Sequence, residues 1–177
     1  MSKDRAQNPG DVDIIKLDIL SSSGEVIDIR DAFLGMDIFE DIFEDCITGA
    51  VTMSDELSLI ENIPLIGNEK IFIVIRTPSL DSSKSRLNVE GRIYKISDRM
   101  PIKENTMGYI LHFCSPEKIY STGIKISKAY KDMLLSDMAI SVYSDYIKPI
   151  RDKLFVAEET AYPRSILVPT WSPFFTL

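Results

Sequence analysis

A tetrad repeats itself in the first third of the chain. Residues 37–45 read Asp-Ile-Phe-Glu-Asp-Ile-Phe-Glu-Asp, and their apolar members recur at a spacing near four. That spacing is typical of a helix with one apolar stripe. The stretch nevertheless runs directly into residues 46–55, which read CITGAVTMSD and alternate in the manner of a strand. Whether residues 37–45 form a helix or a corner between two strands decides whether the front of the chain is helical or a sheet.

Charge argues against the helix. In a helix Glu40 would lie beside Glu44, and Asp41 beside Asp45, one turn apart along the same face. Each like-charge pair costs about 0.3 kcal/mol. Residues 37–45 contain no lysine or arginine that could offset this repulsion.

The alternative is a strand, a tight corner and a second strand. A strand places Met36 and Ile38 on one side of a sheet and Phe39 on the other. Gly49 permits a bend in the strand that follows the corner. We favour this interpretation, while propensity alone leaves the helix open.

Length and charge limit the classes of function. The chain has 177 residues, of which 45% are hydrophobic, so it is globular and long enough for one domain with a core. Its net charge of −7 argues against tight binding to a phosphate backbone or to anionic lipid. The longest wholly apolar run, IFIVI, is far shorter than the roughly 20 residues that span a bilayer. The polar N-terminus has no apolar stretch typical of a signal peptide.

Several further segments have strand patterns. The run KIFIVIRT is continuously apolar, which indicates burial on both faces. In residues 104–114 the side chains of Tyr109, Leu111 and Phe113 share one face. Gly91 marks a bulge or bend in a long strand. The predicted strands cover residues 12–20, 25–30, 70–77, 86–100 and 104–114, and a short helical turn capped by Asp55 covers residues 55–62.

The pattern changes after Cys114. Ser115, Pro116 and Glu117 form a helix start. Apolar residues four apart then predict an amphipathic helix across residues 127–148, ended by Pro149. These residues are Tyr130, Leu134, Met138, Val142 and Tyr146. The fold class predicted is therefore α+β, with an antiparallel β unit followed by helices.

The last residues predict one more helix start. Ser172 is an N-cap residue, and Pro173 stands at the first helical position. We therefore expect the chain to be the front part of a longer protein.

Reactive side chains are few. His112 is the only histidine, and the strand pattern puts Cys114 on its face, with Cys46 far away in the sequence. A structural zinc site usually takes four ligands, and a nucleophilic pair needs an orienting third group. We interpret the cysteines as free buried thiols in a reducing compartment.

Pairs of acidic residues are common in the sequence, but their number does not show that any two of them flank a substrate-binding cleft. The pairs are Glu40 with Glu44, Asp41 with Asp45, and Glu158 with Glu159. A glycosidase needs two carboxylates that flank a substrate at a defined separation. No calcium loop, GxGxxG or Walker sequence is present. The sequence therefore predicts no catalytic residue, no cofactor and no metal site, and the protein is expected not to be an enzyme.

Aromatic side chains allow two interpretations. Those of the second half are core or helix-packing residues in the simpler interpretation, and interface anchors in the other. They are Tyr120, Tyr130, Tyr143, Tyr146 and Trp171.

The order of these features resembles the hub proteins of contractile, T-even-like phage tail baseplates. The stretch FEDIFEDCITGAVTMSDELSLIENIPLIGNEKIFIVIRTP is similar to their pattern of initiating strand, aromatic corner and Gly-containing strand ending in Ser-Asp, followed by a short helix and Pro-x-Ile-Gly-x-Glu. GRIYKISDRMPIKENTMGYILHFCSPEKIYS is similar to the paired strands that lead into a helix. ILVPTWSPFFTL is similar to the junction with the next domain. The resemblance covers residues 12–177.

This resemblance implies a fold and an assembly. Residues 1–11 would be a flexible arm, residues 12–114 a tail-tube-like β-barrel, and residues 115–177 a helical connector with the start of a further domain. Hub subunits carry two such barrels and form homotrimers, so three subunits make a pseudo-sixfold ring. The ring would join the tail tube or tube-initiator protein to the central spike protein, beside other baseplate proteins. The expected location is the virion tail baseplate, assembled in the host cytoplasm.

DNA would pass through the lumen of such a ring without specific binding. Acidic side chains repel phosphate. Those of Asp37, Asp41, Glu44 and Asp45, or those on residues 86–100, could line the lumen, although a solvated acidic face is the ordinary explanation. The alternatives are a tube-initiating baseplate protein or a secretion-system spike base, and then a β-rich ligand-binding module.

Overall fold

A computed structural model describes residues 11–41, 43–44, 46–56, 58–63, 65–78, 86–147 and 155–176. The predicted arm, residues 1–11, lies outside this part of the chain apart from Asp11. The chain divides into two compact units. The first comprises residues 1–40 and 47–115, and the second comprises residues 41–46 and 116–177.

The first unit is a seven-stranded antiparallel sheet with the strand order β2-β1-β5-β6-β7-β4-β3. The strands are β1 (Asp13–Leu20), β2 (Val26–Asp28), β3 (Phe33–Phe39), β4 (Thr48–Asp55), β5 (Lys70–Arg76), β6 (Arg86–Lys103) and β7 (Thr106–Cys114). A short 3-10 helix, η1 (Arg30–Ala32), joins β2 to β3, and α1 (Leu59–Asn62) follows β4. All the predicted strands are confirmed to within a few residues.

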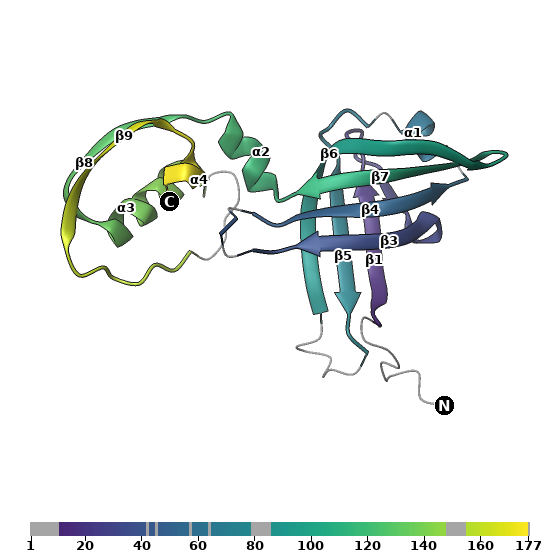
Figure 1. The fold of residues 1–177 in the computed structure, drawn as a ribbon, viewed down its shortest axis with the longest axis horizontal. Helices are drawn as coiled ribbons and strands as arrows, with labels where there is room; N and C mark the ends of the chain where they lie inside the picture. The colour runs from purple at the N-terminus through teal and green to yellow at the C-terminus, as the bar shows by residue number, and fades with distance from the viewer. Residues whose placement is uncertain are drawn as a thin grey trace. The chain divides into compact units, whose positions relative to one another are not determined.

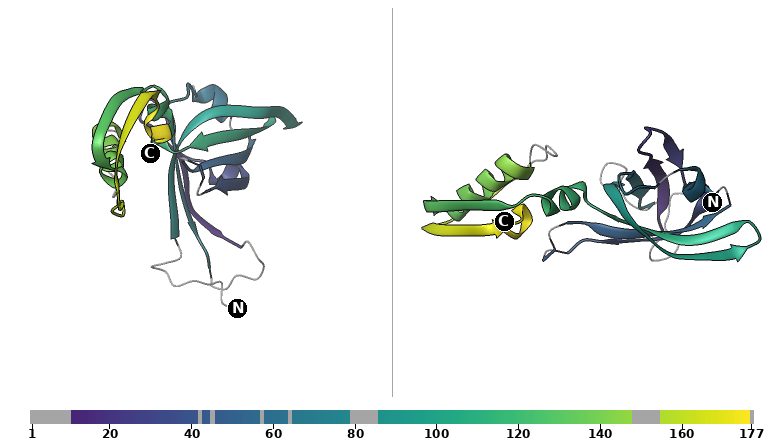
Figure 2. Two further views of the ribbon diagram at one scale, coloured as in Figure 1. Left: turned by 60° about the vertical axis from the view of Figure 1, so that its left-hand side comes forward. Right: turned by 90° about the horizontal axis from the view of Figure 1, so that it is seen from above.

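The sheet folds over on itself along β6, which belongs to two layers. Residues 86–92 of β6 pair with β5, and residues from Arg92 onward pair with β7. The register shifts between Ile93 and Lys95, so a bulge lies where β6 leaves β5. In Figure 1, β1 and β5 run vertically whereas β3, β4 and β7 run horizontally, and Figure 2 shows the same change of direction from two further sides.

The predicted barrel is wrong in one respect, because the sheet is not closed. Within the described ranges no ladder joins β2 to β3, the two end strands of the order. The backbone N–H of Ile29 instead donates to the carbonyl of Leu17 at 2.9 Å, just before the chain turns toward β3. The unit is therefore an open, folded sheet whose two layers enclose one core.

Phe113 lies at the centre of this core and explains two glycines. A Cβ atom on Gly49 would lie 2.3 Å from the Phe113 ring, and one on Gly91 would lie 2.6 Å from it. Gly49 pairs with Phe113 directly, and Gly91 stands on the neighbouring β6. These glycines were predicted to allow bends, but their main role is to make room for an aromatic ring lying on the sheet.

Side-chain alternation along the strands agrees with the sequence patterns. Tyr109, Leu111 and Phe113 all point into the core, as predicted. On β5, Ile71 and Ile73 are fully buried, whereas the intervening Phe72 and Val74 are only half-buried. The predicted burial of β5 on both faces is therefore complete for one face and only partial for the other.

The repeated tetrad is a strand and a corner. β3 ends at Phe39 and β4 begins at Thr48, and the described residues between them form bends and turns. Met36 and Ile38 pack on the core, and Phe39 is exposed on the other face. The strand–corner–strand prediction is confirmed for these positions, whereas Ile42 and Asp45 lie outside the described residues.

The second unit is a two-stranded antiparallel ribbon with short helices. Its elements are α2 (Pro116–Thr122), β8 (Ile126–Leu134), α3 (Leu135–Val142), the π-helix η2 (Tyr143–Ile147), β9 (Pro163–Trp171) and α4 (Pro173–Thr176). α3 lies inside the curve of the ribbon (Figure 1). The core is small, and its buried members are Ile126, Tyr130, Met138, Val142 and Val168. The helix starts at Pro116 and Pro173 are confirmed.

The long helix predicted across residues 127–148 is wrong in its first part. β8 occupies residues 126–134 and pairs with β9, and helix begins only at Leu135. A spacing of four is close to one helical turn, but it is also an even number and so keeps side chains on one face of a strand. Tyr130 and Met138 do share one core, as the pattern predicts, although they come from different elements.

Candidate functional site

One cluster of polar side chains lies where β6 and β7 pair. The hydroxyl of Ser97 donates to Asp98 Oδ2 at 2.8 Å and lies 2.7 Å from His112 Nε2. The donor in the Ser97–His112 contact depends on the imidazole tautomer, whereas the contact with the Asp98 carboxylate uses the serine as donor. A nucleophilic serine donates its proton to the base instead. The sequence patterns did not single out Ser97, since only the pairing of β6 with β7 brings it to His112.

The described residues hold no metal-like cluster. No group of three or more histidine, cysteine or acidic side chains gathers among them. Cys46 is half-buried, Cys114 is buried, and neither forms a disulfide. His112 therefore meets Ser97 and, at 6.2 Å between ring centroids, Tyr94, rather than a set of ligands.

Two buried carboxylates have structural partners. The predicted helical turn over residues 55–62 is shorter than expected, because α1 begins at Leu59 with Ser58 as its N-cap residue and Asp55 is the last residue of β4. The Asp55 carboxylate nevertheless accepts the backbone N–H of Leu59 at 2.7 Å and the hydroxyl of Tyr109 at 3.2 Å. Burial, together with the nearby Asp55 carboxylate, raises the pKa of Tyr109. Glu69 is completely buried and accepts the N–H groups of Ile66 and Gly67, each at 2.9 Å. Both carboxylates fix loops beside the sheet.

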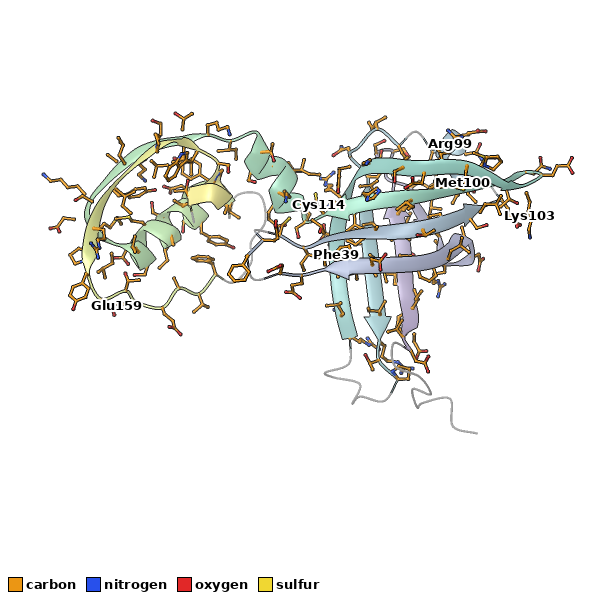
Figure 3. All side chains as sticks on the ribbon, in the orientation of Figure 1. Phe39, Arg99, Met100, Lys103, Cys114 and Glu159 are labelled. Carbon is orange, nitrogen blue, oxygen red and sulfur yellow. The ribbon has the colours of Figure 1, made fainter. Side chains whose placement is uncertain are left out.

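The acidic pairs singled out in the sequence do not converge. Glu40, Asp41 and Glu44 are exposed around the corner after β3, and Asp45 lies outside the described residues. Glu158 and Glu159 are exposed in the loop before β9 (Glu159 is labelled in Figure 3). Asp37 is exposed on β3, whereas the outward positions of the adjacent β4 are the neutral Ala50, Thr52 and Ser54.

The predicted aromatic anchors divide into two groups. Tyr130 is buried in the second core, Tyr146 packs against it, and Tyr143 stacks on Phe155 with ring centroids 4.6 Å apart. Tyr120 and Trp171 keep part of their surface exposed. Among the side chains that the structure describes, the most exposed aromatic ones are Phe43, Tyr162 and Phe39, and these were not among the predicted anchors.

A shallow groove runs beside β6 where this strand leaves β5. Its volume is about 330 Å³. The lining residues are Leu65, Ile66, Gly67, Glu69, Ile93, Tyr94, Lys95 and Ile96. One wall is the loop 65–69. The Glu69 carboxylate fixes this loop by accepting the N–H groups of Ile66 and Gly67, and Arg92 fixes it through hydrogen bonds to Asn68. Ile66 and Tyr94 are 71% and 51% exposed on the rim.

The layer β6-β7-β4-β3 has two open edges. Among the described residues no strand pairs with the outer side of β3, or with residues 93–103 of β6 on the side away from β7. Phe39 is 59% exposed at the end of β3, and Met100 is 55% exposed on β6 (both labelled in Figure 3). Leu34 and Ile102 are also exposed on these edges. Unpaired edges with exposed apolar side chains are typical of surfaces that associate.

Neither a protein-family model nor a curated protein sequence matches the chain. Among solved structures, it is similar to a 43 kDa tail protein of a Shewanella oneidensis prophage, with a TM-score of 0.50 and 13% identity over 88% of this chain and 44% of that one. The chain shares the fold of this tail protein. A tail protein from Neisseria meningitidis gives a TM-score of 0.49 at 11% identity, covering 89% of this chain and 40% of that one.

A component of the type VI secretion system from Escherichia coli gives a TM-score of 0.46 at 9% identity, covering 97% of this chain and 39% of that one. The chain thus spans less than half the length of each of these three structures. No helix in the described part of the chain is long and apolar enough to cross a membrane.

Proposed function

We propose that this chain belongs to a structural subunit of a contractile phage tail baseplate hub, in a ring that joins the tail tube to the central spike. The observation that carries the proposal is the four-stranded layer β6-β7-β4-β3, which among the described residues has no second pairing strand along β3 or along residues 93–103 of β6. The fold shared with the Shewanella prophage tail protein supports it.

The two edges are suited to contact between copies. β3 is one edge of the layer and β6 is the other, so a neighbour turned about a ring axis brings its β6 beside β3. Such a head-to-tail contact makes a ring when its rotation closes. Pairing the edges would satisfy backbone N–H and C=O groups and bury Leu34, Phe39, Met100 and Ile102. The homotrimer comes from the resemblance to hub proteins.

Charge and chemistry are consistent with a passive conduit. The net charge of −7 disfavours adhesion of DNA that passes through the ring. In the Ser97–His112 pair the serine proton points to Asp98, away from the imidazole, so the pair lacks the geometry of an activated nucleophile. We propose a non-enzymatic role, with the tube or tube-initiator protein above the ring, the spike below it, other baseplate proteins around it, and assembly in the host cytoplasm.

Light scattering during size-exclusion chromatography of the full-length protein tests the ring. We expect a mass of three subunits, and rings in negative-stain electron micrographs. A monomer at every concentration would contradict the proposal and favour the β-rich ligand-binding module. Co-purification with a secretion-system spike protein, instead of phage tail proteins, would favour the alternative function as a secretion-system spike base.

A further inference from the structure

One row of side chains crosses the outer face of the layer β6-β7-β4-β3 and has opposite charges at its two ends. Asp37 on β3 pairs with Ala50 on β4. Ala50 pairs with His112 on β7, and His112 pairs with Lys95 on β6. Residues that lie directly opposite each other on antiparallel strands share a face of the sheet. The row therefore begins with a carboxylate at one edge of the layer and ends with an ammonium group at the other.

Asp37 and Lys95 cannot pair with each other within one copy. Their strands are three spacings apart in the sheet, which is about 14 Å. An ion pair needs charged atoms within about 4 Å of each other. Both side chains are exposed, and among the described residues neither forms an ion pair. Each is therefore available to a group of opposite charge on another molecule.

The unpaired edge of β6 has a defined beginning. The backbone N–H of Ile93 donates to the carbonyl of Glu69 at 3.0 Å, so the loop 65–69 occupies this side of β6 as far as Ile93. Beyond it, among the described residues, no strand pairs with residues 94–103 on the side away from β7. A strand that adds to this edge therefore has to end beside Ile93 or Tyr94.

β3 of a second copy fits this edge in one register. Successive strands of the layer alternate in direction, so β3 of one copy runs antiparallel to β6 of the next copy in a ring. β3 ends at Phe39, two residues after Asp37. If Asp37 lies opposite Lys95, β3 ends where the unpaired edge of β6 begins.

Other registers lose one of these features. A shift of two residues toward the loop 65–69 would bring Phe39 into that loop. A shift of two residues in the opposite direction would place Asp37 opposite Ser97, and Lys95 would have no carboxylate beside it. A shift of one residue would put side chains of the two strands on opposite faces of the sheet.

The same register brings two exposed aromatic rings together. Phe39 is 59% exposed and Tyr94 is 51% exposed. The Tyr94 ring lies 6.2 Å from the His112 ring between centroids, which places Tyr94 on the same outer face as the charged row. Phe39 is also on this face, because it follows Asp37 by two positions along β3. Pairing would therefore bury apolar surface beside the ion pair.

Charge along the two edges is opposite as well. Residues 94–103 of β6 contain three cations and one acid, whereas residues 31–39 contain two acids and no cation. Arg99 already pairs with Glu61 at 3.1 Å, so Lys95 is the cation near the beginning of the edge that an incoming carboxylate can use. Complementary charge favours association and selects one register.

We propose that β3 of one copy pairs with β6 of the next copy with Asp37 opposite Lys95, and that this ion pair and the contact between Phe39 and Tyr94 set the register of the ring. The occupant of the β6 edge is a second copy of this chain, because the carboxylate and the ammonium group are the two ends of one row. The inference rests on the proposed ring and adds the residues that align its subunits.

Disulfide trapping in the full-length protein tests the register. Directly opposite residues of antiparallel strands have Cα atoms about 5 Å apart, which a disulfide can span. Asp37→Cys combined with Lys95→Cys should give covalent multimers on oxidation, and mass spectrometry of the linked peptides should show a bond between positions 37 and 95. The separation within one copy is too large for an internal bond.

Two further pairs of substitutions are matched controls for the register. Asp37→Cys combined with Ser97→Cys, or with Arg99→Cys, should form little disulfide under the same conditions. If either of these pairs links more readily than 37 with 95, the proposed register is wrong.

Charge reversal gives a second readout, measured as self-association by analytical ultracentrifugation. Asp37→Lys or Lys95→Asp alone should weaken association about 10-fold, because like charges would then lie opposite each other. The two substitutions together should restore most of the loss. Glu25→Lys, which makes the same change of charge in the turn between β1 and β2, is the control and should have no effect. A double variant as weak as the single ones would contradict the ion pair.

The outcomes separate this contact from the ring itself. If the unaltered protein is a monomer at all concentrations, both the ring and the contact fail. If it forms trimers in which positions 37 and 95 do not link, the contact fails while the ring stands.

Discussion

The two compact units of this chain build their cores differently. Among the described residues, the core of the first unit contains twelve buried hydrophobic side chains between layers of one sheet, around Phe113. The core of the second contains five, from a ribbon and one helix. In the first unit, backbone pairing over seven strands holds the core side chains in register, and glycines are placed to fit one ring. In the second, a two-stranded ribbon depends on the helix that it curves around, since an isolated hairpin is marginally stable. Substitutions that change the size of a core side chain should therefore destabilise the first unit more than the second.

Phe113→Ala should give the largest effect. Removing a fully buried phenylalanine leaves a cavity and lowers the free energy of unfolding by about 4 kcal/mol. Hydrogen exchange should show lost protection in β4, β6 and β7, while α3 and the β8–β9 ribbon keep theirs. An equal loss of hydrogen-exchange protection in both units would contradict the distinction between them, because the two units would then unfold together.

Gly49→Ala should follow closely. The added methyl group would meet both the Phe113 ring and the carbonyl oxygen of Asp37, at 2.3 and 2.6 Å. We expect the free energy of unfolding to fall by about 3 kcal/mol in a urea titration. Gly35→Ala is the matched control, because a Cβ there meets nothing within 4 Å. Similar losses for both variants would show that strand propensity, and not the ring, requires glycine.

Glu69→Ala tests the loop at the edge of the first unit. The N–H groups of Ile66 and Gly67 would lose their buried acceptor, which should lower the free energy of unfolding by about 2 kcal/mol. Proteolysis within residues 65–69 should become faster. A loop as resistant as in the unaltered protein would mean that Arg92 and Asn68 suffice to hold it.

Tyr130→Phe should give the smallest effect, with the opposite sign. Among the described residues the buried Tyr130 hydroxyl has no hydrogen-bond partner. Its removal should raise the stability of the second unit by about 1 kcal/mol, measured by hydrogen exchange in β8 and α3. A loss of stability would show that the hydroxyl does have a partner, such as a buried water.

The candidate site was only partly predictable. Charge repulsion within residues 37–45 predicted the corner after β3, and the pattern around Asp55 predicted that its carboxylate would accept a backbone N–H at the start of α1. Neither pattern predicted that β3 is an end strand of the sheet, because the end strands are known only once the strand order is known. Ser97 meets His112 across a ladder that shifts register twice nearby, and no sequence spacing records such a shift.

The sequence by itself determined which side chains face a core. Alternation along β7 and the even spacing of Tyr130, Met138 and Val142 sorted buried from exposed positions, because these patterns depend only on local geometry. The tertiary structure decided whether residues 126–134 were helix or strand, why Gly49 and Gly91 are glycines, and that the sheet stays open between β2 and β3. Each of these depends on partners distant in the sequence, whose positions are set by packing and strand pairing.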